Sequence, residues 1–328
     1  MDLKILSSLD DVTINRKYAL IIGTHNGIFH SDDVFACALL YLAHHKQIYI
    51  LRTRDEKMLK ECDICVDIGG GEFDHHQIGF NKTRSNGIKY ASAGLVWKSY
   101  GEELVKSILE QYFPGTTLDT DYIFNLFDES YVSLVDCEDN GVKVEPHRFS
   151  YISSFLPPWT SNAPDDFNRH FYQVLVTTIY MVEQTIQTIL GKEIAYNIIT
   201  DNYRDQFFNG ILEIPSQTIN WLETVISIND SVKGYPYVIN FVIFPYPNGG
   251  WAAQCVPPSI KEVTNQRIPF PKEWAGQTDQ LSEISKVEGA EFCHNNLFFV
   301  RATTQDAVIR MCNIATQRFD SKNSNSKS

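Results

Sequence analysis

Short apolar runs alternate with longer, helix-like segments along the first part of the chain. Residues 18–22, 48–51 and 65–68 are apolar runs of strand length, and residues 34–42 and 55–62 lie between them with the length and pattern of helices. Strands that alternate with helices in this way form a parallel sheet with crossover helices. The sequence therefore predicts an α/β fold built on a parallel sheet.

The pattern then becomes helical, and later it changes to strands. Helices are predicted at residues 92–112, 120–139, 166–190 and from there to about 207. Strands are predicted at residues 210–214, 237–244, 251–256 and 292–301, before a last helix from Thr304. We therefore expect two domains, residues 1–207 and a smaller α+β domain at residues 208–328 whose tail from Ser321 is disordered.

Polar residues capable of binding a metal follow the first predicted strand. His25, His30 and Asp32 lie between that strand and the next helix, at the edge where open α/β sheets bind ligands. Imidazole and carboxylate groups together are typical ligands of Mn, Fe, Co or Zn. The alternative is that Asp32 or Asp33 only caps the helix and that the histidines are turn residues.

A second group of such residues follows the third predicted strand. Asp67 lies near the end of this strand, and Asp74, His75 and His76 come after a run of glycines. These side chains are costly to bury without partners, so a metal site shared with the first group is the better explanation. The mixed nitrogen and oxygen ligands make a divalent cation the expected cofactor, Mn before Mg, Co, Fe or Zn.

A third group ends the helix predicted at residues 120–139. Asp136 and Asp139 are three residues apart and share one face of this helix. Acidic residues on a helix are usually solvated, but carboxylates at a helix C-terminus oppose the macrodipole, and a nearby cation would remove that penalty. The sequence leaves open which of the two is a metal ligand.

These segments together resemble the DHH phosphoesterase superfamily and, more closely, the eukaryotic melanocyte-proliferating-gene protein family, formerly labelled metal-dependent protein hydrolases. The resemblance is carried by residues 23–33, 66–70, 73–77, 92–96, 136–141 and 250–257. It implies that one cation is held by His25, His30 and Asp67. It implies that the second is held by Asp32, Asp67, His75 and Asp139, with Asp67 bridging. His30 stands where the wider superfamily has an aspartate, which makes an all-oxygen Mg site less suitable.

The resemblance also implies an activity, a phosphodiesterase that removes nucleotides from the 3′ end of RNA. His76 would face the substrate phosphate, and Asp74 would orient a ligand histidine. Residues 1–207 would form a DHH-like catalytic domain, over which residues 208–328 close to contact substrate. Cationic candidates for substrate binding are Arg84, in a basic loop beside the metal site, and Arg267, His294 and Arg301. The alternative is that the arginines are ordinary solvated charge and that the histidine is a packing residue.

Two other functions stay open at this stage. The older family label suggests a metal-dependent amide or peptide hydrolase, which would need one metal per chain. A sensor that binds a nucleotide without turning it over would use the ions only structurally. Turnover of RNA, dinucleotides or peptides separates the three hypotheses.

Charge and cysteine content limit the partners and the compartment. A formal net charge of −12 and a pI of about 5.2 argue against a broad nucleic-acid-binding surface but leave room for a small phosphate-bearing substrate. The resemblance implies that this substrate is a short single-stranded RNA or a nucleotide. The 7 cysteines have no regular spacing, which indicates a reducing compartment. We expect no membrane segment and an intracellular location, in the cytoplasm or nucleus, with a mitochondrial pool and an oligomeric state left open.

Overall fold

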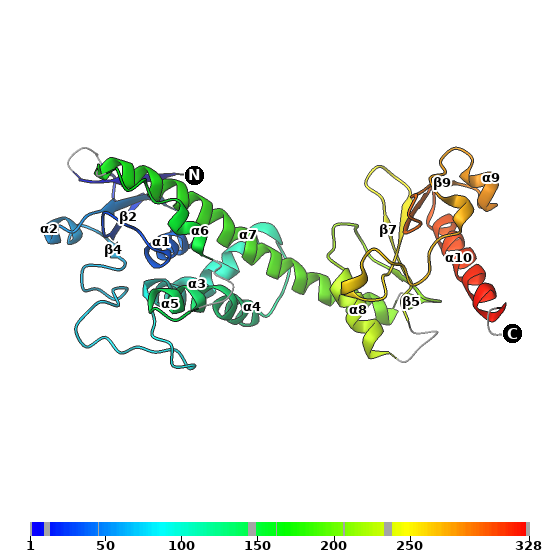
Figure 1. The fold of residues 1–328 in the computed structure, drawn as a ribbon, viewed down its shortest axis with the longest axis horizontal. Coiled ribbons are helices and arrows are strands. Elements are labelled where there is room, and N and C mark those ends of the chain that lie inside the picture. Colours follow the sequence, from blue (N-terminus) through cyan, green and yellow to red (C-terminus); the bar gives the residue numbers. More distant parts are fainter. Residues whose placement is uncertain are drawn as a thin grey trace. The chain divides into compact units, whose positions relative to one another are not determined.

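A parallel sheet forms the centre of the first part of the chain (Figure 1). Its strands lie in the order β1 (Leu3–Leu6), β3 (Gln47–Arg52), β2 (Ala19–Thr24) and β4 (Ile64–Cys65), and each neighbouring pair is parallel. The predicted α/β fold with a parallel sheet is therefore confirmed. The computed structural model describes residues 2–9, 14–44, 46–143, 149–161, 163–205, 207–232 and 238–325.

The strands of this sheet are apolar because side chains on both of its faces are buried. Ile22, Ile48 and Ile50 are completely buried, and Ile21 and Tyr49 point to the other face, where they join a second apolar cluster. A parallel sheet covered on both faces needs continuous apolar strands, which explains why they lack the alternation of a half-exposed sheet. Strand β1 was not predicted, because four residues near the terminus carry too little pattern.

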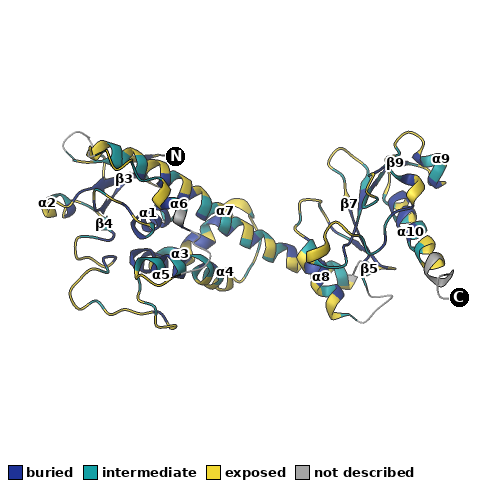
Figure 2. Ribbon diagram, in the orientation of Figure 1, coloured by how far each residue is buried: buried dark blue, intermediate teal, exposed yellow. Residues whose placement is uncertain are grey.

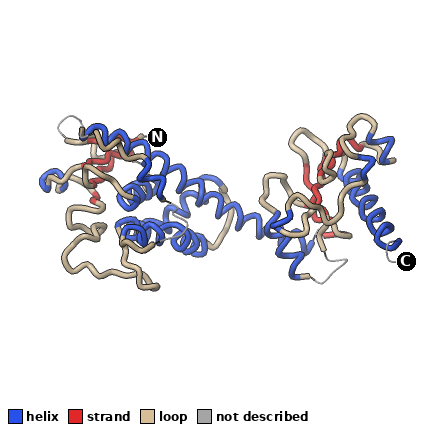
Figure 3. Tube along the Cα trace, in the orientation of Figure 1, coloured by secondary structure: helices blue, strands red, loops and turns tan. Residues whose placement is uncertain are grey.

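Helices connect the strands and cover the sheet (Figure 3). Helix α1 (Ser31–Ala43) follows β2 and packs against α3 (Ser92–Tyr112), and the short α2 (Glu56–Leu59) precedes β4. All residues of α1 from 32 to 40 are buried, so this helix has no polar face. Its polar residues are concentrated in the first turn, next to the sheet edge.

The predicted helix at residues 120–139 is continuous but not uniform. Helix α4 (Thr120–Phe127) passes through a π-helical turn at Asp128–Val132 into α5 (Ser133–Asp139). A π turn inserts one extra residue into the helix and rotates the residues that follow it. It therefore sets which side of α5 carries its carboxylates.

One long helix replaces the two that were predicted after residue 166. Helix α7 (Pro164–Asp205) follows the short α6 (Ser150–Ser154) and has 42 residues. Its only glycine, Gly191, costs helix stability but does not interrupt hydrogen bonding. The chain divides into two compact units, Met1–Leu190 and Gly191–Ser328, so the boundary falls inside α7.

The second unit contains a separate mixed sheet. Its strand order is β5-β6-β7-β8-β10-β9, with only β6 and β7 parallel. The bounds are β5 Phe207–Phe208, β6 Ile211–Glu213, β7 Phe241–Pro245, β8 Trp251–Cys255, β9 Ala290–Cys293 and β10 Phe299–Ala302. The strand predicted at 292–301 is in fact a hairpin, because Leu297 adopts a left-handed backbone that turns the chain.

Both faces of this second sheet are buried (Figure 2). Phe241 and Ile243 of β7 contribute to one core, whereas Val242 and Phe244 contribute to the other. Besides the last part of α7, the described helices of this unit are α8 (Leu222–Ser231), α9 (Leu281–Ser285) and α10 (Gln305–Asn325), with short 3₁₀ turns at Ile260–Glu262 and Lys272–Trp274. Successive residues of β7 from Phe241 to Phe244 therefore face opposite cores, which explains why all of them are apolar.

Two expectations concern segments that are only partly described. The strand predicted from Tyr237 begins outside the described residues, and β7 starts at Phe241. Helix α10 continues to Asn325, into the tail predicted as disordered, and residues 326–328 lie outside the described part. Among the described helices, none has both the length and the apolar character needed to cross a bilayer.

Candidate metal centre

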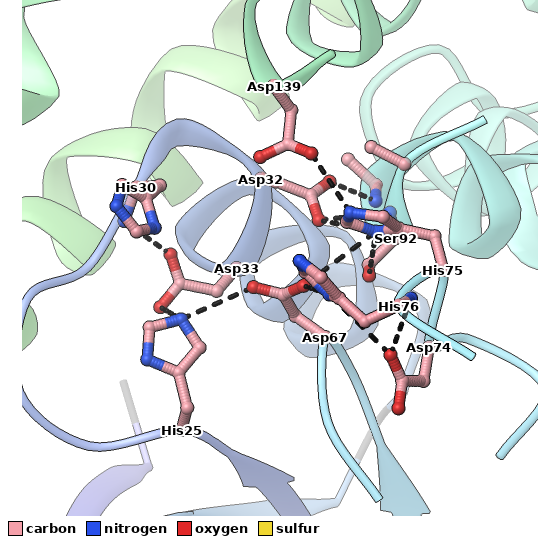
Figure 4. A network of polar contacts seen from close by, with 12 residues as sticks. His25, His30, Asp32, Asp33, Asp67, Asp74, His75, His76, Ser92 and Asp139 are labelled. Atoms are coloured by element: carbon pink, nitrogen blue, oxygen red, sulfur yellow. Dashed lines mark hydrogen bonds and ion pairs between the residues drawn. The ribbon is translucent and has the colours of Figure 1, made fainter. Parts of the chain in front are cut away.

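The loop between β2 and α1 carries the first group of candidate ligands (Figure 4). His25 is 4% exposed, and Asp32 and Asp33 are completely buried in the first turn of α1, whereas His30 is exposed. The main-chain nitrogen of His30 donates to Asp33 Oδ1 at 2.7 Å, which caps the helix as an ordinary N-terminal motif would. Asp33 Oδ2 stays available, 3.5 Å from His25 Nε2.

Asp67 lies between the first group and the second. Its Oδ2 is 3.2 Å from His25 Nε2, and its Oδ1 is 2.9 Å from His76 Nδ1 and 3.7 Å from His75 Nδ1 (Figure 4). The residue follows β4 with a φ of 60°, a left-handed backbone that aspartate tolerates better than most residues. Such strain, of about 1–3 kcal/mol, is concentrated at functional sites.

The loop after the glycine run is fixed by Asp74. Its Oδ2 accepts from the main-chain nitrogen of Gly70 at 2.8 Å, and its Oδ1 accepts from that of His76 at 2.9 Å. The carboxylate is 6% exposed and closes the turn that presents His75 and His76. Asp74 thus holds the turn and the main chain of His76. Its expected role of orienting a histidine ring stays a prediction.

A third group joins helix α1, the histidine loop and the end of α5. His75 Nε2 is 3.0 Å from Asp139 Oδ2, and His75 Nδ1 is 3.6 Å from Asp32 Oδ2. Asp32 also accepts from the main-chain nitrogens of Ser92 and Ala93 at 3.0 and 2.6 Å, and so binds the N-terminus of α3. Asp32 therefore connects three elements at the site.

Asp136 does not lie with these ligands. Its Oδ1 accepts from the main-chain nitrogens of Ala91 and Gly94, each at 3.1 Å, and its Oδ2 accepts from Arg84 Nε at 2.6 Å. With both oxygens engaged in a fully buried position, Asp136 is a structural anchor. Of the two aspartates that the sequence left open, Asp139 is the one that faces the other ligands.

Arg84 has the same structural role from the opposite side. Its side chain is 6% exposed, and Nη1 lies 2.5 Å from Asp128 Oδ2 while Nε contacts Asp136. The predicted role in substrate binding does not fit this position, because the guanidinium is buried between two carboxylates. The sequence could not reveal this ion pair, because Asp136 is 52 residues from Arg84 and a contact over that separation leaves no local pattern.

The buried charges shift the pKa values of the group. Burial raises the pKa of Asp32 well above its usual value, and the charges of Asp67 and Asp139 raise it further. Burial alone would lower the pKa of His25, but the Asp67 carboxylate overcomes this effect, and His75 is raised in the same way by Asp139. In all three groups, the charges of neighbouring carboxylates raise the pKa.

The donor set fits divalent cations. Ligand atoms lie within 4.8 Å of one another in three sets, His25–His30–Asp33, Asp67–His75–His76 and Asp32–His75–Asp139. Asp33 Oδ2 and Asp67 Oδ1 are buried, and although imidazole nitrogens lie near them, neither oxygen accepts a well-formed hydrogen bond from the described residues. Buried carboxylate oxygens without donors are costly unless a cation compensates them, and mixed imidazole and carboxylate ligands suit Mn, Fe, Co or Zn.

Asp33 was not predicted as a ligand. A helix cap was the alternative role for Asp32 or Asp33, and Asp33 does cap α1 with one oxygen. Its second oxygen faces His25 only because the loop folds back on the helix. A carboxylate at N3 of a helix is so common as a cap that no signal in the sequence distinguishes this second role.

The site opens into a cavity of about 820 Å³. His25, His30, Asp67, His75, His76 and Asp139 all line it, together with an apolar wall that includes Phe149, Ile152 and Leu156. Among the described lining residues, Arg54 is the only lysine or arginine. The cavity therefore combines an acidic and histidine-rich floor with one cationic side chain.

The remaining cationic candidates belong to the second unit. Arg301 stacks 4.3 Å from the ring centre of Tyr246, pairs with Glu291 at 2.9 Å and lines a cavity of about 650 Å³ in that unit. His294 accepts from the main-chain nitrogen of Asn296 through Nδ1, within the turn of the β9–β10 hairpin. Arg267 is half-buried. Their roles in substrate binding stay predictions.

These observations define an α/β protein with histidine and carboxylate clusters gathered at the carboxyl edge of a parallel sheet. Residues 21–316 match the MYG1_exonuc family, described as an uncharacterised protein family (UPF0160), and the chain belongs to that family. The predicted resemblance is thereby confirmed.

Similar proteins occur across eukaryotes. A MYG1 exonuclease of Homo sapiens is 28% identical over 327 residues, covering 88% of this chain and 84% of its own length. A MYG1 protein of Dictyostelium discoideum is 29% identical, covering 89% and 95%, and one of Saccharomyces cerevisiae is 28% identical, covering 94% and 99%. Among solved structures, a pGpG-specific phosphodiesterase of Vibrio cholerae is 12% identical and covers 91% of this chain and 98% of its own, with a TM-score of 0.28. A likeness at that score carries no argument.

Proposed function

We propose that this chain is a phosphodiesterase that depends on two divalent cations and removes nucleotides from the 3′ end of RNA. The observation that carries the proposal is the position of Asp67, whose two oxygens face His25 on one side and His75 and His76 on the other. Paired metal sites that share a carboxylate suit phosphoryl transfer, because both attacking and leaving oxygens need stabilisation. Relatives named MYG1 exonuclease support the same class of substrate.

The ligands divide between two positions. His25, His30 and Asp33, with one oxygen of Asp67, would hold one cation. Asp32, His75 and Asp139, with the other oxygen of Asp67, would hold the second. When bound, the cations supply Lewis-acid chemistry: they stabilise charge on phosphoryl oxygens and make water a stronger nucleophile. Manganese suits the mixed nitrogen and oxygen ligands.

Other side chains would bind and orient the substrate. His76 lies at the open side of the site with 63% of its side chain exposed, so it can contact a phosphate oxygen. Asp74 holds His76 through the main chain and acts as a positioning residue. The apolar wall of Phe149, Ile152 and Leu156 gives a ribose or base a surface that excludes water.

An end-labelling experiment tests this function. Purified protein is incubated with Mn²⁺ and single-stranded RNA labelled at either end, with a dinucleotide, and with a peptide mixture. We expect mononucleotides from the 3′ end, a ladder of shortened 5′-labelled products and no peptide cleavage. Absence of phosphodiester cleavage by protein shown to bind two cations per chain would overturn the proposal, and peptide turnover would favour the amide hydrolase.

The matched control is an acidic residue outside the site. Glu102 is exposed on α3 and lines neither of the cavities near the ligands. Glu102→Gln removes the same charge as Asp67→Asn, so it should keep full activity while Asp67→Asn loses it. Equal activity of the two variants would show that the cleavage arises from another centre or a contaminant.

A further inference from the structure

A second cavity lies beside the metal cavity and shares part of its wall. Its volume is about 660 Å³, and it is lined by Arg54, Glu56, Leu59, Lys60, Cys65, Ile68, Gly69 and Gly70. Arg54 and Ile68 also line the metal cavity, so the two spaces meet at these residues. Ile68 directly follows Asp67, which places the junction next to the candidate bridging ligand.

Hydrogen bonds of the residues on either side hold the main chain of Arg54 at this junction, and they leave its side chain unrestrained. Thr53 donates to the carbonyl of Thr24 at 2.9 Å, and Asp55 caps α2 by accepting from Lys57 and Met58. The side chain between these anchors is exposed, and among the described residues no carboxylate lies within ion-pair distance of it. By contrast, Arg84 in the same unit pairs with two carboxylates, Asp128 and Asp136.

The charged residues that line the metal cavity are mainly acidic, whereas those that line the second cavity are mainly basic. The described lining of the metal cavity has the carboxylates of Asp67, Asp74, Glu138 and Asp139 and only Arg54 as a permanent cation. The second cavity has Arg54 and Lys60 against the single carboxylate of Glu56. A phosphate that is not at the metal site is therefore attracted toward the second cavity, where two flexible cations can neutralise it.

We propose that the second cavity is a subsite for the nucleotide next to the one being removed, whose phosphate is bound by Arg54 and Lys60. This inference rests on the proposed function and adds the substrate class: phosphodiesters that carry a second phosphate beyond the one that is cleaved. Leu59 and Ile68 supply an apolar surface for the ribose or base of that nucleotide. Arg54 is thus a specificity-determining residue that favours chains over dinucleosides.

Two substrates that differ by one nucleotide test the subsite. The dinucleoside monophosphate ApA has one phosphate, and the trinucleotide ApApA has a second. For Arg54→Ala we expect the ratio of kcat/KM for ApApA over ApA to fall about tenfold or more, because one charge-assisted contact is lost. Arg54→Lys should restore part of the ratio. Lys60→Ala should lower it, whereas Lys57→Ala, on the same helix but outside both cavities, should not.

Binding without turnover gives an independent measurement. A phosphorothioate ApApA analogue is titrated by fluorescence anisotropy at several salt concentrations in the presence of Mn²⁺. Loss of one phosphate contact should reduce the slope of log K against log salt by about 0.7 in Arg54→Ala. Unchanged thermal unfolding midpoints show that the variants are folded.

An unchanged substrate ratio together with an unchanged salt slope in Arg54→Ala would overturn the subsite. If the wild-type protein cleaves neither these substrates nor longer single-stranded RNA, the proposed function fails, and the salt slope then decides the subsite by itself. If the wild-type protein cleaves both substrates and Arg54→Ala changes neither the ratio nor the salt slope, the proposed function stands and the subsite is wrong.

Discussion

At the scale of single residues, the site depends on where carboxylate oxygens point. Asp67 has a left-handed backbone, and this conformation lets one carboxylate face histidines of two different loops. Asp32 and Asp33 are neighbours in α1 but bind different elements, α3 and the preceding loop. Buried carboxylates of this kind stabilise the folded protein only when a cation or donor compensates each oxygen.

Asp67→Asn should remove the shared ligand with little change of the backbone. Asparagine tolerates the left-handed conformation as well as aspartate does, so the loop keeps its shape. We expect the bound metal to fall from two to at most one ion per chain and RNA cleavage to fall more than about 100-fold. Elemental analysis and single-turnover assays measure both; retention of two ions would show that Asp67 does not bridge.

Arg84→Met should destabilise the first unit, because it leaves Asp136 buried without its counterion. The expected loss in free energy of unfolding is about 3–5 kcal/mol, measured by urea denaturation. In the double variant with Asp136→Asn the loss should be smaller than the sum of the two single losses. Additive losses would mean that the two side chains do not interact.

The loss in Arg84→Met should also depend on pH. Burial raises the pKa of Asp136 to about 6 while Arg84 opposes the rise, so removing Arg84 raises it further. A carboxyl whose folded pKa exceeds its unfolded value contributes stability at low pH that is lost as pH rises through the folded pKa. The variant should therefore lose more stability relative to wild type at pH 8 than at pH 5, and the opposite order would contradict this assignment.

At the scale of elements, the N-termini of two helices meet the carboxylates. Asp32 in the first turn of α1 accepts from the first turn of α3, and Asp136 of α5 accepts from Ala91 and Gly94 at the same end of α3. Helix N-termini stabilise negative charge through their free main-chain donors and their dipole. Helix α3 therefore fixes the two helices that carry the candidate ligands.

Gly94→Ala tests this contact between helices. A Cβ at Gly94 would overlap the Asp136 carboxylate, so the alanine must separate α3 from α5. We expect a loss of about 1–3 kcal/mol in the free energy of unfolding, typical of overpacking. Gly71→Ala is the matched control because a Cβ there meets no atom within 4 Å. Equal stability of the two variants would show that α3 and α5 are not tightly coupled.

At the scale of the whole molecule, each unit has its own sheet and its own core. The candidate ligands all belong to Met1–Leu190, whereas the predicted substrate residues Arg267, His294 and Arg301 belong to Gly191–Ser328. Cations that bind only the folded state stabilise it in proportion to their affinity and concentration. Metal binding should therefore stabilise the first unit specifically.

Removal of the cations should lower the thermal unfolding midpoint. With free Mn²⁺ at a hundred times its dissociation constant, the metal contributes about 2.7 kcal/mol per site, and a chelator removes this contribution. Differential scanning calorimetry with chelator and after Mn²⁺ is restored measures the shift. The shift should be largely absent in Asp67→Asn, and an equal shift in that variant would place the stabilising ions elsewhere.

The sequence alone determined the order of strands and helices. Apolar runs of strand length, and polar residues in the first turn of a helix, are signals that the local sequence carries. Helix α3 begins and ends where its pattern predicted, and the histidine and aspartate groups appear at the ends of β2 and β4 as expected. Local periodicity and turn chemistry are enough for such features.

Only the tertiary structure decided which carboxylates are available to a metal. Asp136 and Asp139 are equivalent in sequence, but Arg84 and the start of α3 occupy the first and leave the second facing His75. The free oxygen of Asp33 and the junction at Arg54 likewise arise where separate segments meet. Contacts between residues far apart in the chain have no local pattern, so three-dimensional packing alone assigns them.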